Sequence, residues 1–447
     1  MSGNPDRTLT HISTDSRTIQ AGDLFVPIRG ENFDGHRFVE QAAQKGAAGA
    51  LVEESWNGDV PPTFALIRVA DTLVAYQQIA ASYRRSLPLK VIAITGSNGK
   101  TSTKDFVAAA LSRRFRVTKT EGNFNNHVGL PQTMLNASAQ DEIAVWELGM
   151  NHPGEIAALA GLALPDVGII TNIGVAHIEF MGSREAIAQE KGALAEAVKA
   201  DGTMILNADD AFSASIARRT RAKTIFAGIG SGTVRADDIR QSASGSEFTI
   251  LEGAHRCRAQ LPVAGLHMVQ NAVLAVAAGR AFGLSIEECA AGLASAPLTK
   301  ARLQLREIRG VQFLDDSYNA NPESMKAALR TLVELDAEGQ RIAVLGQMNE
   351  LGVEAERGHA EVGETAASLR IDYLITVGEQ GAAISRAAAR AGLEKTTNVA
   401  APAEAADVLS DLTSAGDLVL VKGSRSARME RVLEAFSQQE SAISNSR

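Results

Sequence analysis

Val91-Ile92-Ala93-Ile94-Thr95-Gly96-Ser97-Asn98-Gly99-Lys100-Thr101-Ser102-Thr103 is the stretch that decides the fold of this chain. Its first four residues are apolar and partly β-branched, which predicts a buried strand. A glycine-containing turn follows, and the residues from Lys100 to Leu111 are compatible with a helix. A strand, a turn with inward-pointing N–H groups and a helix N-terminus form a cradle for an anion, because the helix dipole places roughly +0.5 charge at that end. The stretch therefore predicts a phosphate-binding loop.

The glycines of this stretch have the spacing of a short phosphate loop, T-G-x-x-G-K-T, whereas the more common loop has a longer spacing. Glycine is needed where the backbone approaches a phosphate or adopts a positive φ. In such a loop Lys100 reaches the β- and γ-phosphates of a nucleotide, and the Thr101 hydroxyl ligates magnesium. The nucleotide-binding residues that we expect here are Gly96, Ser97, Asn98, Gly99, Lys100, Thr101 and Ser102. A surface strand–turn–helix without a ligand is the alternative.

The length and composition indicate a multidomain globular protein. A chain of 447 residues is too long for one hydrophobic core and indicates about three domains. Its formal net charge of -8 argues against nucleic acid or a membrane surface as a partner. Only Cys257 and Cys289 occur, and Met1 to Arg7 has no apolar core, so we expect no disulfide framework, no signal peptide and a cytoplasmic location. No apolar run is long enough to span a membrane.

The order of strand and helix signals predicts an α/β protein with three domains. Short strands and helices before Pro88 indicate a small N-terminal α/β module over residues 1–88. Strands and helices then alternate over residues 89–299, the pattern of a mostly parallel sheet covered on both faces. The alternation restarts over residues 300–447 and predicts a second, Rossmann-like open sheet. We expect antiparallel strands between Thr224 and Val263, and a last helix from Ala427 to Phe436.

Polar side chains at strand ends are the candidate chemical groups, because ligands of such sheets bind beyond the carboxyl ends of the strands. Glu147 ends the apolar strand Ile143–Trp146, and burial of a carboxylate there is costly unless it meets a cation. We therefore expect a magnesium ligand, with a solvated glutamate as the alternative. His177 lies in the loop after another expected strand, where a metal or phosphate role competes with a purely structural one.

Two further segments are rich in polar side chains. Asn123, Asn125 and Asn126 form an amide cluster, and amides supply both donors and acceptors for a peptide or a sugar. A plain turn is the alternative. In the segment 315–322, Asn321 with Pro322 fits the start of a helix. That explanation does not account for the two adjacent aspartates and the tyrosine at the end of a strand. Lys191, read alone, is a surface lysine on a helix.

Taken together, these motifs resemble the Mur ligases, the ATP-dependent amino-acid-adding enzymes of peptidoglycan precursor synthesis. Residues 95–101 resemble the phosphate loop of the family, and residues 146–149 and 171–183 resemble its metal loops. Lys191 matches the lysine that the family carbamylates. Residues 267–271 match a segment that contacts adenine, and residues 300–303 match one whose arginine reaches the ATP phosphates. The ATP-binding residues that the resemblance adds are Asn271, Arg302 and Asp316.

Within the family, the chain is most similar to members that add D-alanyl-D-alanine. The similar segments are residues 120–126, 315–322, 345–352 and 421–426. Residues 13–17, 22–26 and 30–36 resemble the module that holds the UDP sugar. The D-N-P-R motif of the sibling that adds diaminopimelate or lysine is absent, although that sibling remains the alternative. The chain departs from the usual family pattern at Met268, Ala301, Gln347 and Asn349.

The resemblance implies that D-Ala-D-Ala is joined to UDP-N-acetylmuramoyl-tripeptide (UDP-MurNAc-tripeptide) through an acyl phosphate, with ATP and two magnesium ions. It implies catalytic roles for Lys100, Glu147, His177 and Lys191, and metal ligation by Thr101, Glu147, His177 and carbamylated Lys191. It also implies that the UDP sugar binds within 1–88, ATP within 89–299 and the dipeptide within 300–447, in a monomer. The implied substrate-binding residues are Ser16, Arg17, Asn32, Asn123, Asn125, Asn126, Tyr318, Asn319, Ser424 and Arg425.

Overall fold

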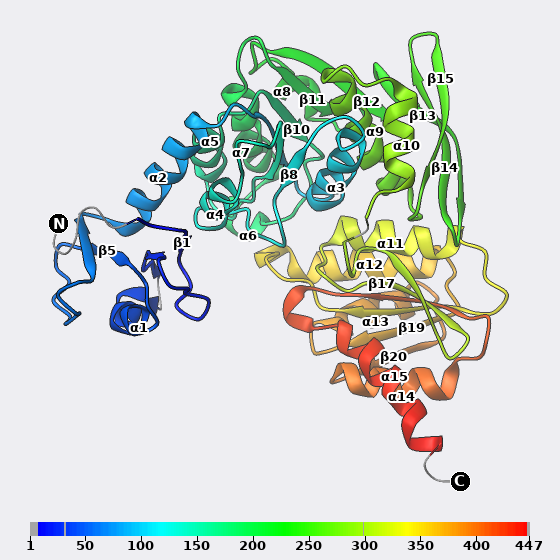
Figure 1. The fold of residues 1–447 in the computed structure, drawn as a ribbon. Coiled ribbons are helices and arrows are strands. Elements are labelled where there is room, and N and C mark those ends of the chain that lie inside the picture. Colours follow the sequence, from blue (N-terminus) through cyan, green and yellow to red (C-terminus); the bar gives the residue numbers. More distant parts are fainter. Residues whose placement is uncertain (1–7, 31–32, 298, 445–447) are drawn as a thin grey trace.

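The structure, a computed structural model, describes residues 8–30, 33–297 and 299–444. The expectations for Asn32 and for Met1 to Arg7 lie outside these described residues. Figure 1 shows three α/β units that follow one another along the chain, with the N-terminal unit joined to the central one by helix α2. Over the described ranges, no helix is both long and apolar enough to cross a membrane.

The N-terminal unit is built on a small parallel sheet with the strand order β1-β2-β5-β6. Its strands are β1 (Ile12–Ser13), β2 (Leu24–Phe25), β5 (Gly49–Glu53) and β6 (Ala65–Val69). A separate ribbon pairs β3 (Arg29–Gly30) with β4 (Phe33–Asp34). The helices are the 3-10 turn Gly35–Phe38, α1 (Val39–Gln44) and α2 (Thr72–Ser86). Asp71 caps α2 by accepting a hydrogen bond from the Val74 N–H, which satisfies one of the free donors at the start of the helix.

The central unit contains a nine-stranded sheet with the order β15-β14-β13-β12-β11-β10-β7-β9-β8. Its strands are β7 (Lys90–Thr95), β8 (Val117–Lys119), β9 (Ile143–Glu147), β10 (Val167–Ile170), β11 (Thr203–Asn207), β12 (Lys223–Ile229), β13 (Val234–Ser242), β14 (Gly245–Glu252) and β15 (His255–Leu261). Pairing is parallel from β8 to β13 and antiparallel only at β13-β14-β15. The expectation of antiparallel strands from Thr224 to Val263 is thus wrong for β12, which extends the parallel sheet between β11 and β13.

Helices cover both faces of the central sheet, as the alternation predicts. They are α3 (Lys100–Leu111), α4 (Gly129–Leu135), α5 (Glu155–Ala163), α6 (Ile178–Met181), α7 (Arg184–Ala197), α8 (Ser213–Ala217), α9 (Leu266–Ala281) and α10 (Ile286–Ala294). The apolar sequence of strand β7 is explained by its position between two cores. Ile92 and Ile94 lie in the core that α3 and α9 cover, whereas Val91 and Ala93 lie in the core that α5 and α7 cover. A strand buried on both faces has no polar side.

The C-terminal unit is a second open sheet with the order β16-β17-β21-β18-β19-β20. Its strands are β16 (Gln304–Ile308), β17 (Val311–Asp316), β18 (Arg341–Gly346), β19 (Tyr373–Val377), β20 (Thr396–Val399) and β21 (Leu418–Lys422). Only the edge strand β16 is antiparallel. The helical segments are α11 (Pro322–Glu334), Gly352–Glu354, α12 (Ala355–Ser368), α13 (Gly381–Arg390), α14 (Pro402–Leu412), Arg425–Ala427 and α15 (Glu430–Ser444). The last helix thus begins and ends later than the sequence predicts.

The central and C-terminal units pack directly on each other. One hydrophobic cluster includes residues of α9 and of α11, among them Met268 and Met325. Hydrogen bonds also cross between the units: the Asn321 amide donates to Asn98 Oδ1 over 2.7 Å, and the Val175 N–H donates to the Glu323 carboxylate over 3.0 Å. The carboxyl end of β7 therefore faces the carboxyl end of β17 across an interface with fixed contacts.

Candidate active site

The phosphate loop follows β7 and leads into α3, and its two glycines are needed for steric reasons. Gly96 has φ +150°, and a Cβ there would lie 1.8 Å from Thr171 Oγ1. Gly99 has φ +81°, and its Cβ would lie 2.4 Å from Asn271 Oδ1. The loop is also held from one side, because the Asn172 side chain accepts from the Asn98 N–H over 2.9 Å and donates to the Asn98 carbonyl over 3.1 Å. Contacts within the protein therefore hold the loop in this conformation.

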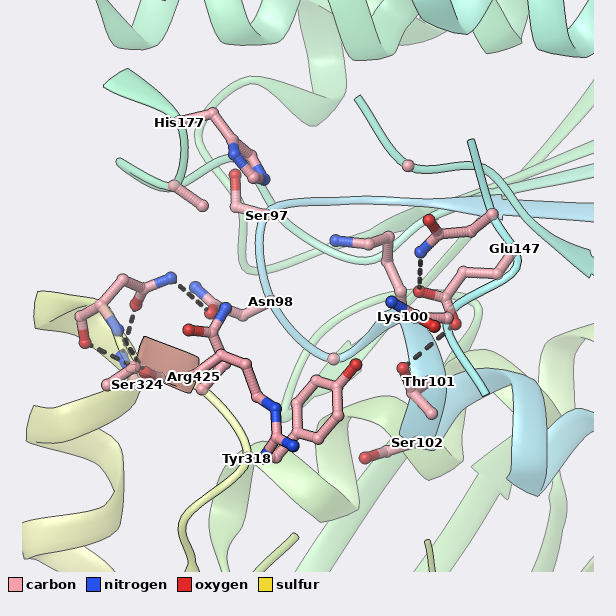
Figure 2. Close-up of a pocket in the computed structure, with 18 of the residues that line it drawn as sticks. Ser97, Asn98, Lys100, Thr101, Ser102, Glu147, His177, Tyr318, Ser324 and Arg425 are labelled. Atoms are coloured by element: carbon pink, nitrogen blue, oxygen red, sulfur yellow. Dashed lines mark hydrogen bonds between the residues drawn. The ribbon is translucent and has the colours of Figure 1, made fainter. Parts of the chain in front are cut away.

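Lys100 begins α3 and lies in this loop, as shown in Figure 2. Its ammonium donates to the Gly96 carbonyl over 2.7 Å, so the lysine folds back over the loop. Burial lowers the pKa of Lys100, the Glu147 carboxylate opposes that shift, and Arg302 adds to it. A phosphate in the loop would meet this ammonium and the free N–H groups at the start of α3.

Glu147 at the end of β9 is the buried carboxylate of the site, with 3% exposure. The Thr101 hydroxyl donates to Glu147 Oε2 over 3.0 Å, and the Asn125 amide donates to Oε1 over 2.9 Å. Both partners are neutral, and among the residues that the structure describes no cationic side chain lies within ion-pair distance of Glu147. The Lys100 ammonium acts on this carboxylate only from beyond ion-pair distance, so a bound cation would complete the balance of its charge.

His177 lies in the loop after β10 with φ +66°. Its Nδ1 is 2.6 Å from Glu350 Oε2, a residue of the C-terminal unit, and its ring lies beside Ser97 in Figure 2. The sequence indicates His177 as a site residue but not Glu350, which lies in the segment 345–352 that resembles the family. No local signal in the sequence indicates that the two loops meet, because they are far apart in the chain and belong to different sheets.

Lys191 is not the surface lysine that its local sequence predicts. It lies on α7 with 1% exposure, and it does not line the pocket described below. Burial lowers the pKa of Lys191 well below its usual value, the Lys100 ammonium lowers it further, and Glu190 opposes the shift. Within the described ranges no carboxylate is within ion-pair distance of Lys191. Burial without an ion-pair partner favours the neutral amine, so the local chemistry departs from that of an ordinary lysine.

Lys100, Glu147, His177 and Glu350 line one pocket of about 460 Å³ between the central and C-terminal units. Of the residues expected to bind ATP, all but Gly96 line it. Among the expected metal ligands, Thr101, Glu147 and His177 line it. Among the expected substrate-binding residues, it is lined by Asn123, Asn125, Asn126, Tyr318, Asn319 and Arg425. Figure 2 shows Tyr318 and Arg425 in the same pocket as Lys100 and Glu147.

Arg302 and Asp316 enter the pocket from the start of the C-terminal unit. The Arg302 guanidinium lies over the Tyr318 ring, 4.2 Å from its centroid, and reaches Thr101 Oγ1 over 3.5 Å. Such a stacked cation is held in place by the ring. Asp316 pairs with the Lys422 ammonium over 2.5 Å, and that ammonium also donates to the Asn319 carbonyl over 2.9 Å. The end of β17 is thereby tied to the end of β21.

Some amide residues also have structural roles. The Asn126 side chain accepts from the Val128 and Gly129 N–H groups at the start of α4. The Asn321 side chain caps α11 by accepting from the Ser324 N–H, as the helix-start interpretation predicts, and it also contacts Asn98. The structural and the functional interpretations therefore both apply to Asn321.

Three expected substrate-binding residues do not line the pocket. Ser424 is buried, and its hydroxyl donates to Asn349 Oδ1 over 3.3 Å. Ser16 and Arg17 lie in the N-terminal unit. The Ser16 carbonyl accepts from the Lys45 ammonium, and the exposed Arg17 pairs with Asp15 over 2.6 Å. A substrate that reached Ser16 and the pocket together would have to span two units.

Three family models match the chain in succession. They are described as "Mur ligase family, catalytic domain" for residues 8–86, "Mur ligase middle domain" for residues 94–279, and "Mur ligase, glutamate ligase domain" for residues 301–425. The chain is 40% identical to the UDP-N-acetylmuramoyl-tripeptide--D-alanyl-D-alanine ligase of Bacillus subtilis (strain 168), over 96% of this chain and 93% of the relative. The chain belongs to the Mur ligase family.

Other comparisons agree with this membership. The UDP-N-acetylmuramoyl-tripeptide--D-alanyl-D-alanine ligase of Escherichia coli (strain K12) is 36% identical, over 96% of this chain and 94% of that protein. A crystal structure of MurF from Acinetobacter baumannii matches with a TM-score of 0.89 and 33% identity, over 96% and 94% of the two chains. MurF ligase from Thermotoga maritima in complex with ADP matches with a TM-score of 0.88 and 28% identity, over 98% and 100%. The predicted three-domain α/β architecture of a Mur ligase is confirmed.

Proposed function

We propose that this Mur ligase joins D-alanyl-D-alanine to UDP-N-acetylmuramoyl-tripeptide, with ATP converted to ADP and phosphate. The observation that carries the proposal is the single pocket in which the phosphate loop, Glu147 and His177 face Tyr318 and Arg425. The relatives named for this reaction match nearly the whole chain, which supports the same substrates here. The second candidate is the function of the sibling that adds diaminopimelate or lysine. The substrate test below distinguishes the two functions.

The three units divide the substrates between them in this proposal. Residues 1–88 bind the UDP sugar, residues 89–299 bind ATP, and residues 300–447 bind the incoming dipeptide. ATP and nucleotide-linked sugars are compounds of the cytoplasm, which is where this reaction would take place. One chain supplies the phosphate loop and the facing C-terminal residues of the pocket, so the proposed enzyme works as a monomer.

The reaction needs a carboxylate to become an electrophile, because a carboxylate is a poor one at neutral pH. Transfer of the γ-phosphoryl group of ATP forms an acyl phosphate, the dipeptide amine attacks its carbonyl carbon, and phosphate leaves. Lys100 and Arg302 would hold the phosphate oxygens, since both cations reach the loop. The contacts between the central and C-terminal units hold the two sides of the pocket together, and closure of the pocket around the substrates would keep water from the acyl phosphate.

Magnesium fits the residues on the loop side of the pocket. Thr101 and Glu147 already meet, and Glu147 lacks a cationic partner, so these two are the expected ligands of one ion. His177 is the expected ligand of a second ion. When bound, the two ions would neutralise charge on the phosphate oxygens. Across the described residues no three His, Cys, Asp or Glu side chains gather as a metal site, so hydroxyl, phosphate and modified-lysine oxygens would have to complete the ligand sets.

Lys191 is proposed to carry a carbamate that serves as an anionic ligand. Only a neutral amine reacts with carbon dioxide, and the buried surroundings of Lys191 favour that form. Lys191→Ala should lose most activity, and formate or acetate should restore part of it by filling the vacated anionic position. Mass spectrometry of the intact protein under carbon dioxide, after trapping of the carbamate, gives a readout that does not depend on turnover. A fully active Ala variant with no trapped adduct would return Lys191 to a structural role.

The deciding experiment is phosphate release from ATP with UDP-N-acetylmuramoyl-tripeptide, measured with and without D-Ala-D-Ala. Release should depend on the dipeptide and should not occur with free diaminopimelate or lysine. Mass spectrometry of the product should show addition of one dipeptide. If the single amino acids support release with a UDP-N-acetylmuramoyl-dipeptide acceptor and the dipeptide does not, the sibling function is correct.

A further inference from the structure

The loop between β18 and α12 enters the pocket, yet the proposed chemistry gives it no role. Asn349 and Glu350 line the pocket, whereas Met348 beside them is 1% exposed. The loop thus has two polar side chains on the active-site surface and one apolar anchor beneath it. Glu350 has φ +60°, an uncommon conformation for a residue with a side chain, so its backbone is held by the surrounding contacts.

This loop connects three parts of the site. The Asn349 amide donates to Ser426 Oγ over 2.7 Å, in the segment that follows β21. Glu350 reaches His177 through its side chain, and its carbonyl accepts from the Glu179 N–H over 3.3 Å. The loop is therefore the point at which the C-terminal unit contacts the candidate catalytic histidine of the central unit.

The side chain of His359 fixes the start of this loop from below. His359 lies on α12 with 1% exposure, and its Nε2 accepts from the Met348 N–H over 3.0 Å. Its Nδ1 lies 2.6 Å from the Ala355 carbonyl, one helical turn earlier. Because a backbone N–H can only donate, the ring must be neutral with its hydrogen on Nδ1, which donates to Ala355. Burial lowers the pKa of His359, which favours this neutral form.

We propose that His359 is a positioning residue of the ligase, which holds the Met348 peptide so that Glu350 reaches His177 and Asn349 reaches Ser426. The expected effect on ligation kinetics rests on the proposed function. The expected effect on the structure of the loop does not. An apolar side chain of similar size would fill the space of the imidazole and leave the Met348 N–H buried without an acceptor. The role of the ring is therefore directional and not only one of packing.

Two substitutions separate these roles. His359→Gln places an amide oxygen near the position of Nε2 and can accept from the Met348 N–H. His359→Met has no such acceptor. Val362→Ala is the matched control, because Val362 is a fully buried residue of the same helix whose apolar side chain makes none of the hydrogen bonds that hold the loop.

Hydrogen exchange of the amides of residues 347–351 tests the inference in the nucleotide-free protein and needs no substrate. We expect exchange of these amides to be roughly tenfold faster than in wild type in His359→Met and close to wild type in His359→Gln. In Val362→Ala, these amides should exchange no faster, relative to wild type, than the other amides of the C-terminal unit. Uniformly faster exchange throughout the C-terminal unit in His359→Met and Val362→Ala alike would show that His359 only stabilises the fold, and would overturn the proposal.

Ligation kinetics then test the consequence. In His359→Met, kcat with D-Ala-D-Ala should fall roughly tenfold or more. The Kd of ATP should stay within about twofold, because among the described residues no hydrogen bond joins residues 347–351 to the phosphate loop. His359→Gln should recover most of the kcat. Combining His359→Met with Glu350→Ala should cost less than the sum of the two single losses, since both variants weaken the contact between Glu350 and His177. Additive losses would contradict the proposal. If the wild-type protein does not ligate the dipeptide, the proposed function fails while the exchange result stands.

Discussion

Replacement of Glu147 by Gln tests whether the carboxylate of this residue serves ligand binding or the stability of the fold. The substitution preserves the shape of the side chain and removes its charge. In the structure each carboxylate oxygen accepts one hydrogen bond, from Thr101 over 3.0 Å and from Asn125 over 2.9 Å. Glutamine can retain both contacts if the Asn125 amide rotates to present its oxygen, because Thr101 can still donate to the remaining carbonyl.

Two opposing effects decide the stability of Glu147→Gln. Each hydrogen bond to the charged group contributes about 1.5–3 kcal/mol, roughly twice the contribution of a neutral one, so the variant loses up to a few kcal/mol from these contacts. It also avoids the burial of an unpaired carboxylate, which costs several kcal/mol. We therefore expect the free energy of unfolding without ligands to stay within about 1 kcal/mol of wild type, or to rise.

Ligand binding should behave in the opposite way. A ligand present at 100 times its Kd stabilises the folded state by about 2.7 kcal/mol. If loss of the anionic ligand weakens binding of the magnesium–nucleotide complex roughly 100-fold, the same concentration stabilises the variant by only about 0.4 kcal/mol. The Tm should thus rise by several degrees in wild type and by at most about one degree in Glu147→Gln.

Thermal unfolding with and without magnesium and a non-hydrolysable ATP analogue measures both quantities. Glu288→Gln is the control, because Glu288 belongs to the capping box of α10 and lies outside the pocket. That control should lower the Tm and leave the ligand-induced rise intact. The reasoning is refuted if Glu147→Gln destabilises the free protein by more than about 2 kcal/mol, or if its ligand-induced rise equals that of wild type.

Three further outcomes follow from the same geometry. Lys100→Ala should keep the fold by circular dichroism and reduce ligation by about two orders of magnitude or more, and near-normal turnover would exclude its phosphate role. Gly96→Ala should destabilise the protein by at least about 1–3 kcal/mol in denaturant and abolish nucleotide binding, because its Cβ would lie 1.8 Å from Thr171 Oγ1. Asp166→Asn should cost about 1–3 kcal/mol at pH 7. Burial raises the pKa of Asp166, but hydrogen bonds from Lys199, Val91 and Lys90 outweigh it and lower the pKa. The stabilisation is therefore complete above the unfolded pKa of about 3.9 and is lost as the pH falls through the lower folded pKa, so urea titrations of variant and wild type should converge at acid pH.

The sequence predicts best where local chemistry determines local structure. The phosphate loop is one such place, since Gly96 and Gly99 are required by backbone geometry that a short motif specifies. Helix α11 is another, because Asn321 and Pro322 mark its start as predicted. Strand β7 is recognisable because burial on both faces leaves it uniformly apolar.

The remaining features depend on contacts that no local pattern encodes. Lys191 is buried because α7 packs its small neighbours against the sheet, and the surrounding sequence is compatible with an exposed helix face. Glu350 joins the site only because the loop after β18 meets the loop after β10 between the two units. Strand β16 (Gln304–Ile308) is not predicted by the sequence pattern, because its residues are half-buried or exposed. They form a strand by pairing with β17.

The contacts between the two larger units converge on the phosphate loop and its support. Asn98, at the tip of the loop, contacts Asn321 of the C-terminal unit and Asn172 of the segment after β10. That same segment donates from Val175 to Glu323 and carries His177 to Glu350. Separation of the units would therefore remove restraints from the nucleotide loop and from the candidate catalytic histidine together. Binding of a substrate that bridges the units would stabilise both, which links formation of the active geometry to exclusion of water from the acyl phosphate.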